Sequence, residues 1–523
     1  MDRPAETSSA RRAPLPRRAT GFETPGTAAL DALVFAAAPD VRRAGVCSDG
    51  VFLRRIHLDV LGTLPTAQEA RAFLASSDPA KRLRLVDALL GRSEFADRWG
   101  GKWADVLRIK AEFPINLWPQ GAAVYDRWVR RCIADNEPFD RFARQLLTSS
   151  GSNFQCAPAN FYRAIQGRTA RDIAAAVALT FMGMRASSWP PQKLAGLAAF
   201  FSQVAYKSTG QWKEEIVYFD RLKPRGGAAV FPDGTAANWA EDRDGREVFA
   251  DWLISPRNPY FARAVVNRIW CWLMGRGIIH ECDDIRPDNP PADPQVLAYL
   301  EKQLVGAGWD LKHIYRLILR SGMYQRVAGL TRQKEKGERQ NSEQEERRQD
   351  LLPLAFRLLP FTYVVRRLDA ELIIDALCQI SGTTERYSSP IPEPFTYVPE
   401  GTKALALPDG SITSSFLEMF GRPARDSGLE SERNNAPTAA QRLHLLNSSH
   451  IQRKLSGPKL AGLMRGGRPV ESVTEIYLTI LSRFPTSREL AALRSYAQGM
   501  TWRAAMQDLI WALVNSAEFL YRH

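Results

Sequence analysis

The sequence lacks most of the short motifs that identify a reaction. Its six cysteines form no C-x-x-C pair, the spacing that builds zinc, dithiol and c-type haem sites. Its six histidines form no H-E-x-x-H pair, and no G-x-S-x-G, G-x-x-x-x-G-K-[ST] or G-x-G-x-x-G motif occurs. Zinc-protease, serine-hydrolase, P-loop and Rossmann interpretations therefore lose their usual support.

Long apolar runs and a secretion signal are missing as well. No apolar segment reaches the roughly 20 residues that span a bilayer, and the longest, residues 173–182, predicts a buried helix. Residues 1–25 carry positive charge but no apolar stretch that follows it, as a signal peptide would. We therefore expect no transmembrane segment and, by default, a cytoplasmic location.

What the sequence does contain is enough apolar material for large cores and an excess of positive charge. It is 45% hydrophobic, and 70 Lys and Arg against 57 Asp and Glu give a net charge of +13. Such an excess raises the expectation of an anionic partner. The charge is scattered except in the basic amino-terminal tail, and no specific nucleic-acid motif accompanies it.

The pattern of apolar residues predicts a mainly α fold with two helical domains, recurrent helical hairpins and few short strands. Apolar side chains recur at helical spacing in both halves of the chain, as at Leu85, Val86 and Leu89. We predict a disordered basic tail over residues 1–25, a first domain over 26–221, a Gly- and Pro-containing connector over 222–245 and a second domain over 246–523. Residues 331–350, with no aliphatic or aromatic side chain, predict a charged linker.

Two similar segments near the ends of the chain predict a repeated hairpin. PTAQE at residues 65–69 and PTSRE at 485–489 both fit the capping box, in which Thr caps a helix and Glu reaches back to it. About 20 residues later, LVDALLGRSEF at 85–95 resembles LIWALVNSAEF at 509–519. A packing role explains such a repeat as well as a functional one does.

The residues resemble a planctomycete cytochrome-associated family with two tandem domains of unknown function. FLRRIHLDVLGTLPT at 52–66 and RWGGKWAD at 98–105 are similar to its cytochrome-type first domain. Four later segments are similar to its planctomycete-specific second domain: WLISPRNPYFARAVVNRIW at 252–270, RRLDAE at 366–371, FGRP at 420–423 and LLN at 445–447. The resemblance implies an exported, envelope-associated protein, in contrast to the location expected from the amino terminus.

The haem-attachment motif of that family is missing here. Many relatives carry a C-A-x-C-H segment just before a sequence like YGLAAFF, where two thiols and a histidine would hold a haem. Here residues 182–201 read MGMRASSWPPQKLAGLAAFF, without either cysteine or the histidine. We therefore expect no covalent haem and predict no cofactor, with a divalent metal as the open possibility.

Two groups of charged residues are candidates for a site. Asp283, Asp284 and Asp288 offer hard oxygen ligands for a divalent metal, although ion pairs with nearby arginines explain them equally well. Guanidinium groups bind carboxylates and phosphates, and arginines with one asparagine lie in the family-like segments. These candidate ligand-binding residues are Arg263, Asn267, Arg268, Arg366, Arg367, Arg422 and Arg433.

Aromatic and thiol side chains add minor expectations. Trp118, Trp189 and Trp212 lie near Pro, Gly or polar residues and are the best candidates for exposed rings that stack on sugars or bases. The pair Cys271 and Cys282 is a weak disulfide candidate, and buried free thiols explain the cysteines more simply.

Together these features predict a haem-less binding or scaffold protein for an anionic, glycan-like or protein partner. The first alternative is a metal-assisted hydrolase that uses the loop of Asp283, Asp284 and Asp288. The second alternative is a redox protein with noncovalent haem.

Overall fold

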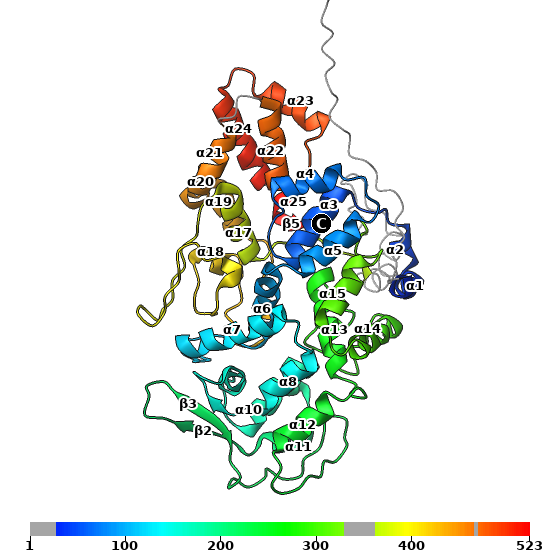
Figure 1. Ribbon diagram of the computed structural model, residues 1–523, viewed down its shortest axis with the longest axis vertical. Helices are drawn as coiled ribbons and strands as arrows, with labels where there is room; N and C mark the ends of the chain where they lie inside the picture. Colours follow the sequence, from blue (N-terminus) through cyan, green and yellow to red (C-terminus); the bar gives the residue numbers. More distant parts are fainter. Residues whose placement is uncertain (1–27, 329–360, 465–468) are drawn as a thin grey trace, which may run out of the picture.

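The protein is mainly helical, as predicted, with strands only in small sheets. The computed structural model describes residues 28–328, 361–464 and 469–523. The predicted tail over residues 1–25 and charged linker over 331–350 lie outside these described residues. Figure 1 shows α3 and α4 beside α22 and α25, so a segment from the first part of the described chain lies next to its last helices.

The first part of the chain folds into helices joined by one small antiparallel sheet. Strand β3 (Glu215–Phe219) lies between β1 (Gly151–Ser152) and β2 (Val204–Ser208), with Tyr206 opposite Val217. The helices are α1 (Ala28–Ala37), α2 (Pro39–Arg43), α3 (Asp49–Val60), α4 (Ala67–Ala75), α5 (Lys81–Leu90), α6 (Glu94–Val106), α7 (Pro119–Ala134), α8 (Phe139–Thr148), α9 (Asn160–Arg163), α10 (Ala170–Met182) and α11 (Pro191–Ala198).

The second part continues with helices and a two-stranded ladder in which β4 (Arg366–Arg367) pairs with β5 (Tyr521–Arg522). This ladder brings the chain end to the middle of the molecule, because Arg366 lies opposite Arg522. The helices are α12 (Gly245–Leu253), α13 (Phe261–Met274), α14 (Pro294–Gly306), α15 (Leu311–Arg320), α17 (Ala370–Ser381), α18 (Ser415–Met419), α19 (Ala439–Asn447), α20 (Ser449–Leu455), α21 (Pro458–Met464), α22 (Pro469–Leu481), α23 (Ser487–Tyr496), α24 (Trp502–Val514) and α25 (Ala517–Leu520).

Two large hydrophobic cores and a small third cluster, of Leu53, Ala70 and Leu478, fill the described part of the molecule. The larger core joins the first helices to α12–α15, so buried residues on both sides of the predicted connector 222–245 share it. Trp99 on α6 packs there against Tyr315 on α15 and Trp272 on α13, with ring centroids 4.3 Å and 5.9 Å away. The smaller core is built on α17 and the helices that follow it.

The two predicted capping boxes are both present. Thr66 accepts from the amide of Glu69 and Thr486 from that of Glu489, and each glutamate side chain accepts from the backbone amide of its threonine. Helix α4, which begins after the first box, contacts α22, the helix that precedes the second box. The buried guanidinium of Arg54 on α3 adds to the contact between these parts of the chain by donating to carbonyl oxygens of α22 and α25 at 2.7 Å and 2.9 Å.

Candidate functional site

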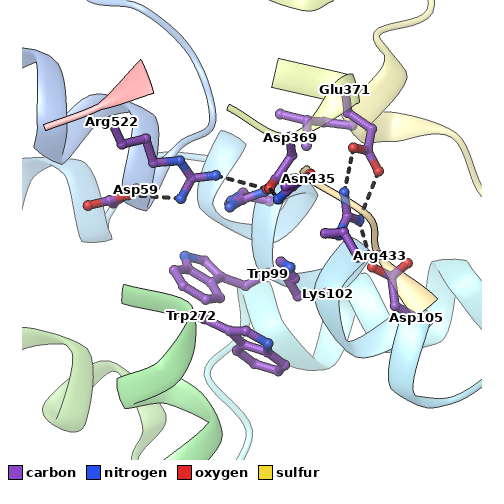
Figure 2. Close-up of polar contacts among 12 residues, drawn as sticks. Asp59, Trp99, Lys102, Asp105, Trp272, Asp369, Glu371, Arg433, Asn435 and Arg522 are labelled. Carbon is purple, nitrogen blue, oxygen red and sulfur yellow. Dashed lines mark hydrogen bonds and ion pairs between the residues drawn. The ribbon is translucent and has the colours of Figure 1, made fainter. Parts of the chain in front are cut away.

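A charged hollow lies where α6, the end of α13 and the segment 430–435 meet. It encloses about 850 Å³, including the open space at its mouth. Four carboxylates line it together with five cationic side chains: Arg98, Lys102, Arg366, Arg433 and Arg522. We call it the charged pocket. Figure 2 shows its upper wall of paired charges above the indole rings of Trp99 and Trp272.

Asp369 is the centre of the upper wall. Its carboxylate accepts from Arg98 at 3.0 Å, from Arg522 at 2.8 Å and from the Asn435 amide at 2.8 Å. Burial alone would raise the pKa of Asp369, but the surrounding positive charges, above all Arg522, hold it well below the usual value. Arg522 also donates to buried Asp59 at 3.0 Å, so the chain end is tied to α3.

Arg433 holds together two further carboxylates beside the pocket. It donates to both oxygens of Glu371, at 2.7 Å and 3.0 Å, and to Asp105 at 2.8 Å. Asp105 also accepts from Arg425 at 2.9 Å. Burial opposes ionisation of Asp105, yet Arg433 and Arg425 lower its pKa to about 2. Both acids are therefore fully ionised and paired near neutral pH.

The remaining carboxylates of the wall also have partners. Glu430 binds the Lys102 ammonium at 3.1 Å and accepts from the Trp272 indole at 2.8 Å. Asp283 pairs with Arg268 at 2.9 Å and accepts from the backbone amide of Glu430 at 2.6 Å. The carboxylate oxygens of Glu430 and Asp283 therefore already accept hydrogen bonds from the protein and need none from a ligand.

Arg366 is the cation of the pocket that is least well paired. One terminal nitrogen donates to the carbonyls of Trp272 and Leu273 at 2.6 Å and 3.2 Å. The other, Nη1, has no hydrogen-bond partner among the described residues. The carboxylate of Asp59 is 4.0 Å away. Gly275 makes room for this guanidinium, since a Cβ there would lie 2.2 Å from Nη1.

The structure brings together only part of the predicted arginine group. Arg366 and Arg433 line the charged pocket. Arg268 does not line it but pairs with Asp283, which does. Asn267 does not line it; its side chain accepts from the amide and donates to the carbonyl of Ile279.

The other predicted arginines serve packing contacts. Arg367 donates to the carbonyls of Phe420, Asn434 and Asn435. Arg422 donates to the carbonyls of Ile412 and Asp409 and lies 3.7 Å from Glu371. Arg263 pairs with Glu301 on α14 at 2.8 Å.

The three predicted metal-binding carboxylates do not converge. Asp283 is buried against Arg268, whereas Asp284 and Asp288 pair with Arg286 at 3.2 Å and 3.4 Å. In the part of the chain that the structure describes, no group of three or more His, Cys, Asp or Glu side chains is arranged to hold a metal ion.

Sequence reasoning missed Arg98, Lys102, Asp369, Glu430 and Arg522. Arg98 and Lys102 lie within the RWGGKWAD segment, and Asp369 lies within RRLDAE, so the family-like motifs held a usable signal. Arg522 and Glu430 lie outside the family-like motifs, and only the fold places them in the pocket.

Another missed cluster lies beside α17. His444 and His450 are six positions apart, a spacing that would put them on different faces of a single helix, but they meet because they lie on the consecutive helices α19 and α20. Their rings are hydrogen-bonded at 3.1 Å, and His450 contacts Glu385 at 2.9 Å. The Lys454 ammonium pairs with the same carboxylate at 2.7 Å.

Asp375, on α17, gives the protein a distinct pH dependence. Its carboxylate accepts from the amides of Ala404 and Leu405, but burial outweighs these bonds and raises its pKa from 3.8 to about 7. Between these values the folded chain holds one more proton than the unfolded chain. This group therefore lowers the free energy of unfolding by about 1.4 kcal/mol for each pH unit of increase.

Urea unfolding at pH 5, inside this window, and at pH 7, at its upper end, measures that slope. We expect Asp375→Asn to remove this contribution, because asparagine does not titrate. Equal pH slopes for the parent chain and Asp375→Asn would contradict the assignment.

Two of the three tryptophans predicted to be exposed form an aromatic cluster. Trp118 and Trp212 contact each other and Phe395, with ring centroids 4.7 Å to 5.4 Å apart. Trp212 is 61% exposed and Phe395 48%. The Lys213 ammonium lies 5.0 Å and 5.6 Å from the two indole centroids. Trp189, in contrast, packs partly buried against the larger core.

Two family models match the chain, one after the other. PSCyt2, described as a protein of unknown function (DUF1549), matches residues 30–187, and PSD1, described as a protein of unknown function (DUF1553), matches residues 245–497. The charged pocket draws residues from both matched regions. Neither the curated proteins nor the solved structures contain a match. Within the described residues, every helix is too short or too polar to cross a membrane.

Proposed function

This chain belongs to the family that joins a PSCyt2 domain to a PSD1 domain, both of unknown function, and on that premise we propose a binding protein whose charged pocket takes a small anion. The observation that carries the proposal is Arg366, a cation whose ion-pair contact, with Asp59, is as long as 4.0 Å in a wall where the acids have closer partners. One further negative charge would complete this arrangement, because a partly desolvated guanidinium gains strongly from a charged acceptor.

The ligand class follows from the donors that face the hollow. Lys102 offers an ammonium beside Glu430, which also accepts from the Trp272 indole, and Arg366 offers a guanidinium beside the Trp272 carbonyl. Guanidinium forks fit planar carboxylates and tetrahedral oxyanions alike. A small carboxylate, sulfate ester or phosphate ester is therefore the proposed ligand class.

We expect Arg366→Ala to weaken binding of inorganic sulfate or succinate about 10- to 100-fold, because a hydrogen bond to a charged group contributes about 1.5 to 3 kcal/mol. Isothermal titration calorimetry measures the effect. Arg263→Ala is the matched control, since it removes an arginine that pairs with Glu301 away from the pocket. Equal affinities for the Arg366→Ala variant and the parent would contradict the proposal.

A glycan-like partner is the second candidate, and the aromatic cluster of Trp118, Trp212 and Phe395 supports it. Centroid separations of 4.7 Å to 5.4 Å leave no space between the rings, so a ligand would meet their outer faces. The C–H face of a sugar ring packs well on such a surface. The backbone supports a functional role too, because Trp118 and Lys213 adopt positive φ values of 67° and 64°, which cost energy in non-glycine residues.

We expect Trp212→Ala to abolish retention of the chain on insoluble cellulose or on immobilised alginate, because it removes the most exposed ring of the cluster. Sedimentation with the polysaccharide measures retention. Trp511→Ala, which removes a partly exposed indole on α24, is the control. Unchanged retention after Trp212→Ala would exclude the cluster as the sugar site.

The metal-assisted hydrolase and the noncovalent haem protein stay predictions. For the first, an added metal would have to displace Arg268 from Asp283 and Arg286 from Asp284 and Asp288. Elemental analysis and an absorption spectrum of the purified chain distinguish these alternatives from the binding protein.

A further inference from the structure

Cys271 and Cys282 are held opposite each other by two buried clamps. Helix α13 ends at Gly275, and the chain then doubles back along it. Asn267 binds Ile279 through both of its side-chain groups, at 2.9 Å and 3.0 Å. Arg268 then binds Asp283 at 2.9 Å. These clamps fix the returning segment beside the helix immediately before Cys271.

The clamps bring the two thiols into contact. Cys271 follows Asn267 by one helical turn, and Cys282 precedes Asp283 directly, so both side chains face the same gap. Cys271 is the neighbour with the largest effect on the pKa of the Cys282 thiol, as expected of two side chains that lie next to each other. Both side chains line the charged pocket. Cys282 is buried, whereas Cys271 is partly exposed, so Cys271 is the thiol that a soluble reagent reaches.

We propose that Cys271 and Cys282 form a reversible dithiol–disulfide pair in the wall of the charged pocket. The oxidant is a small disulfide such as glutathione disulfide. The Cys271 thiolate attacks one of its sulfurs and expels one glutathione thiolate. Cys282 then loses its proton and attacks the Cys271 sulfur, which expels the second glutathione. The protein loses two protons and two electrons, and glutathione disulfide is reduced to two thiols.

The clamps favour the intramolecular step over a lasting mixed disulfide. Their four side-chain hydrogen bonds hold the second thiol next to the first, which replaces a bimolecular step by an intramolecular one. The neighbouring Cys271 side chain and burial raise the pKa of the Cys282 thiol, which assigns the first attack to Cys271. Cys156 and Cys378, partly exposed free thiols on other elements, are internal comparisons.

The test uses the full chain incubated with glutathione disulfide, alkylated with iodoacetamide and mapped by mass spectrometry. We expect a peptide pair linked through Cys271 and Cys282, lighter by two hydrogens and separated again by dithiothreitol. Cys282→Ser should instead carry glutathione on Cys271, and Cys378→Ser should leave the link unchanged. Circular dichroism shows whether each variant folds, and the parent chain alone decides the main result.

Two outcomes would overturn the proposal. One is alkylation of both Cys271 and Cys282 in the treated parent chain. The other is a glutathione adduct that persists on Cys271 while Cys282 stays free. Either result would show that the thiols cannot reach disulfide geometry, which needs a sulfur–sulfur distance of about 2.05 Å.

A link between this pair and ligand binding rests on the proposed function. Because Cys271 is reached through the pocket, bound sulfate should slow disulfide formation in the parent chain but not in Arg366→Ala. Absence of the sulfate effect would overturn the anion proposal and leave the disulfide itself standing. Absence of the disulfide would overturn the redox pair and leave anion binding to be judged by calorimetry.

Discussion

Asp369→Ala is expected to lower the free energy of unfolding by about 3 to 5 kcal/mol, as removal of one partner from a buried ion pair does. The substitution leaves Arg98 and Arg522, both almost fully buried, without the carboxylate that they share. It also frees the Asn435 amide. Because Arg98 lies on α6 and Arg522 in β5, the loss should loosen the contact between the start and the end of the chain.

Urea unfolding followed by circular dichroism measures this loss. Asp284→Ala is the control, because Asp284 pairs with the half-exposed Arg286, and surface pairs contribute only about 0 to 1 kcal/mol. A loss for Asp369→Ala no larger than that of the control would mean that the network does not hold the two parts together. The pH dependence of this contribution also has a definite direction. Because the pKa of Asp369 is lower in the folded chain, the contribution is fully present above the pKa of the unfolded chain and is lost on acidification.

Trp99→Ala should lower the free energy of unfolding by a similar amount, about 3 to 5 kcal/mol, because it empties a large site in the main core. Trp99 is 1% exposed and contacts the rings of Phe95, Trp272 and Tyr315. Its indole also donates to the carbonyl of Val60 at 3.1 Å. The substitution also removes the ring that packs against Trp272, a residue that lines the charged pocket.

The same unfolding experiment tests this prediction, with Trp99→Phe as the matched variant. Phenylalanine keeps part of the ring volume but cannot donate to Val60, so we expect a smaller loss than for alanine. If alanine and phenylalanine cost the same, the hydrogen bond rather than packing would dominate at this position. A loss below about 1 kcal/mol for alanine would contradict the assignment of Trp99 to the core.

Features that depend on nearby residues could be predicted from the sequence. The mainly helical fold follows from apolar periodicity, and the capping boxes at Thr66 and Thr486 follow from side chains three residues apart. Local sequence patterns predict secondary structure less well where contacts between distant residues determine it. The apolar spacing of residues 366–381 predicts one helix, but the structure begins this segment with strand β4, because Arg366 and Arg367 pair with the end of the chain.

The charged pocket could not be predicted as a whole, because it joins residues far apart in the sequence. Arg98 and Asp369 are 271 positions apart, and Asp59 and Arg522 are 463 apart. The residue type alone does not separate these arginines. Arg263 pairs with one partly exposed carboxylate, Arg366 binds backbone carbonyls, and Arg433 pairs with the two carboxylates of Glu371 and Asp105. Only the fold distinguishes the guanidinium that lacks a close acid from those that are paired.

The most direct test of the anion pocket is a crystal structure grown with selenate, whose selenium can be located by anomalous scattering. The proposal predicts an anomalous peak within hydrogen-bonding distance of the Arg366 guanidinium, between α6 and the end of α13. The peak should be missing from crystals of Arg366→Ala. Selenate found only at other surface cations, with the space beside Arg366 filled by solvent, would contradict the proposal that this chain binds anions in the charged pocket.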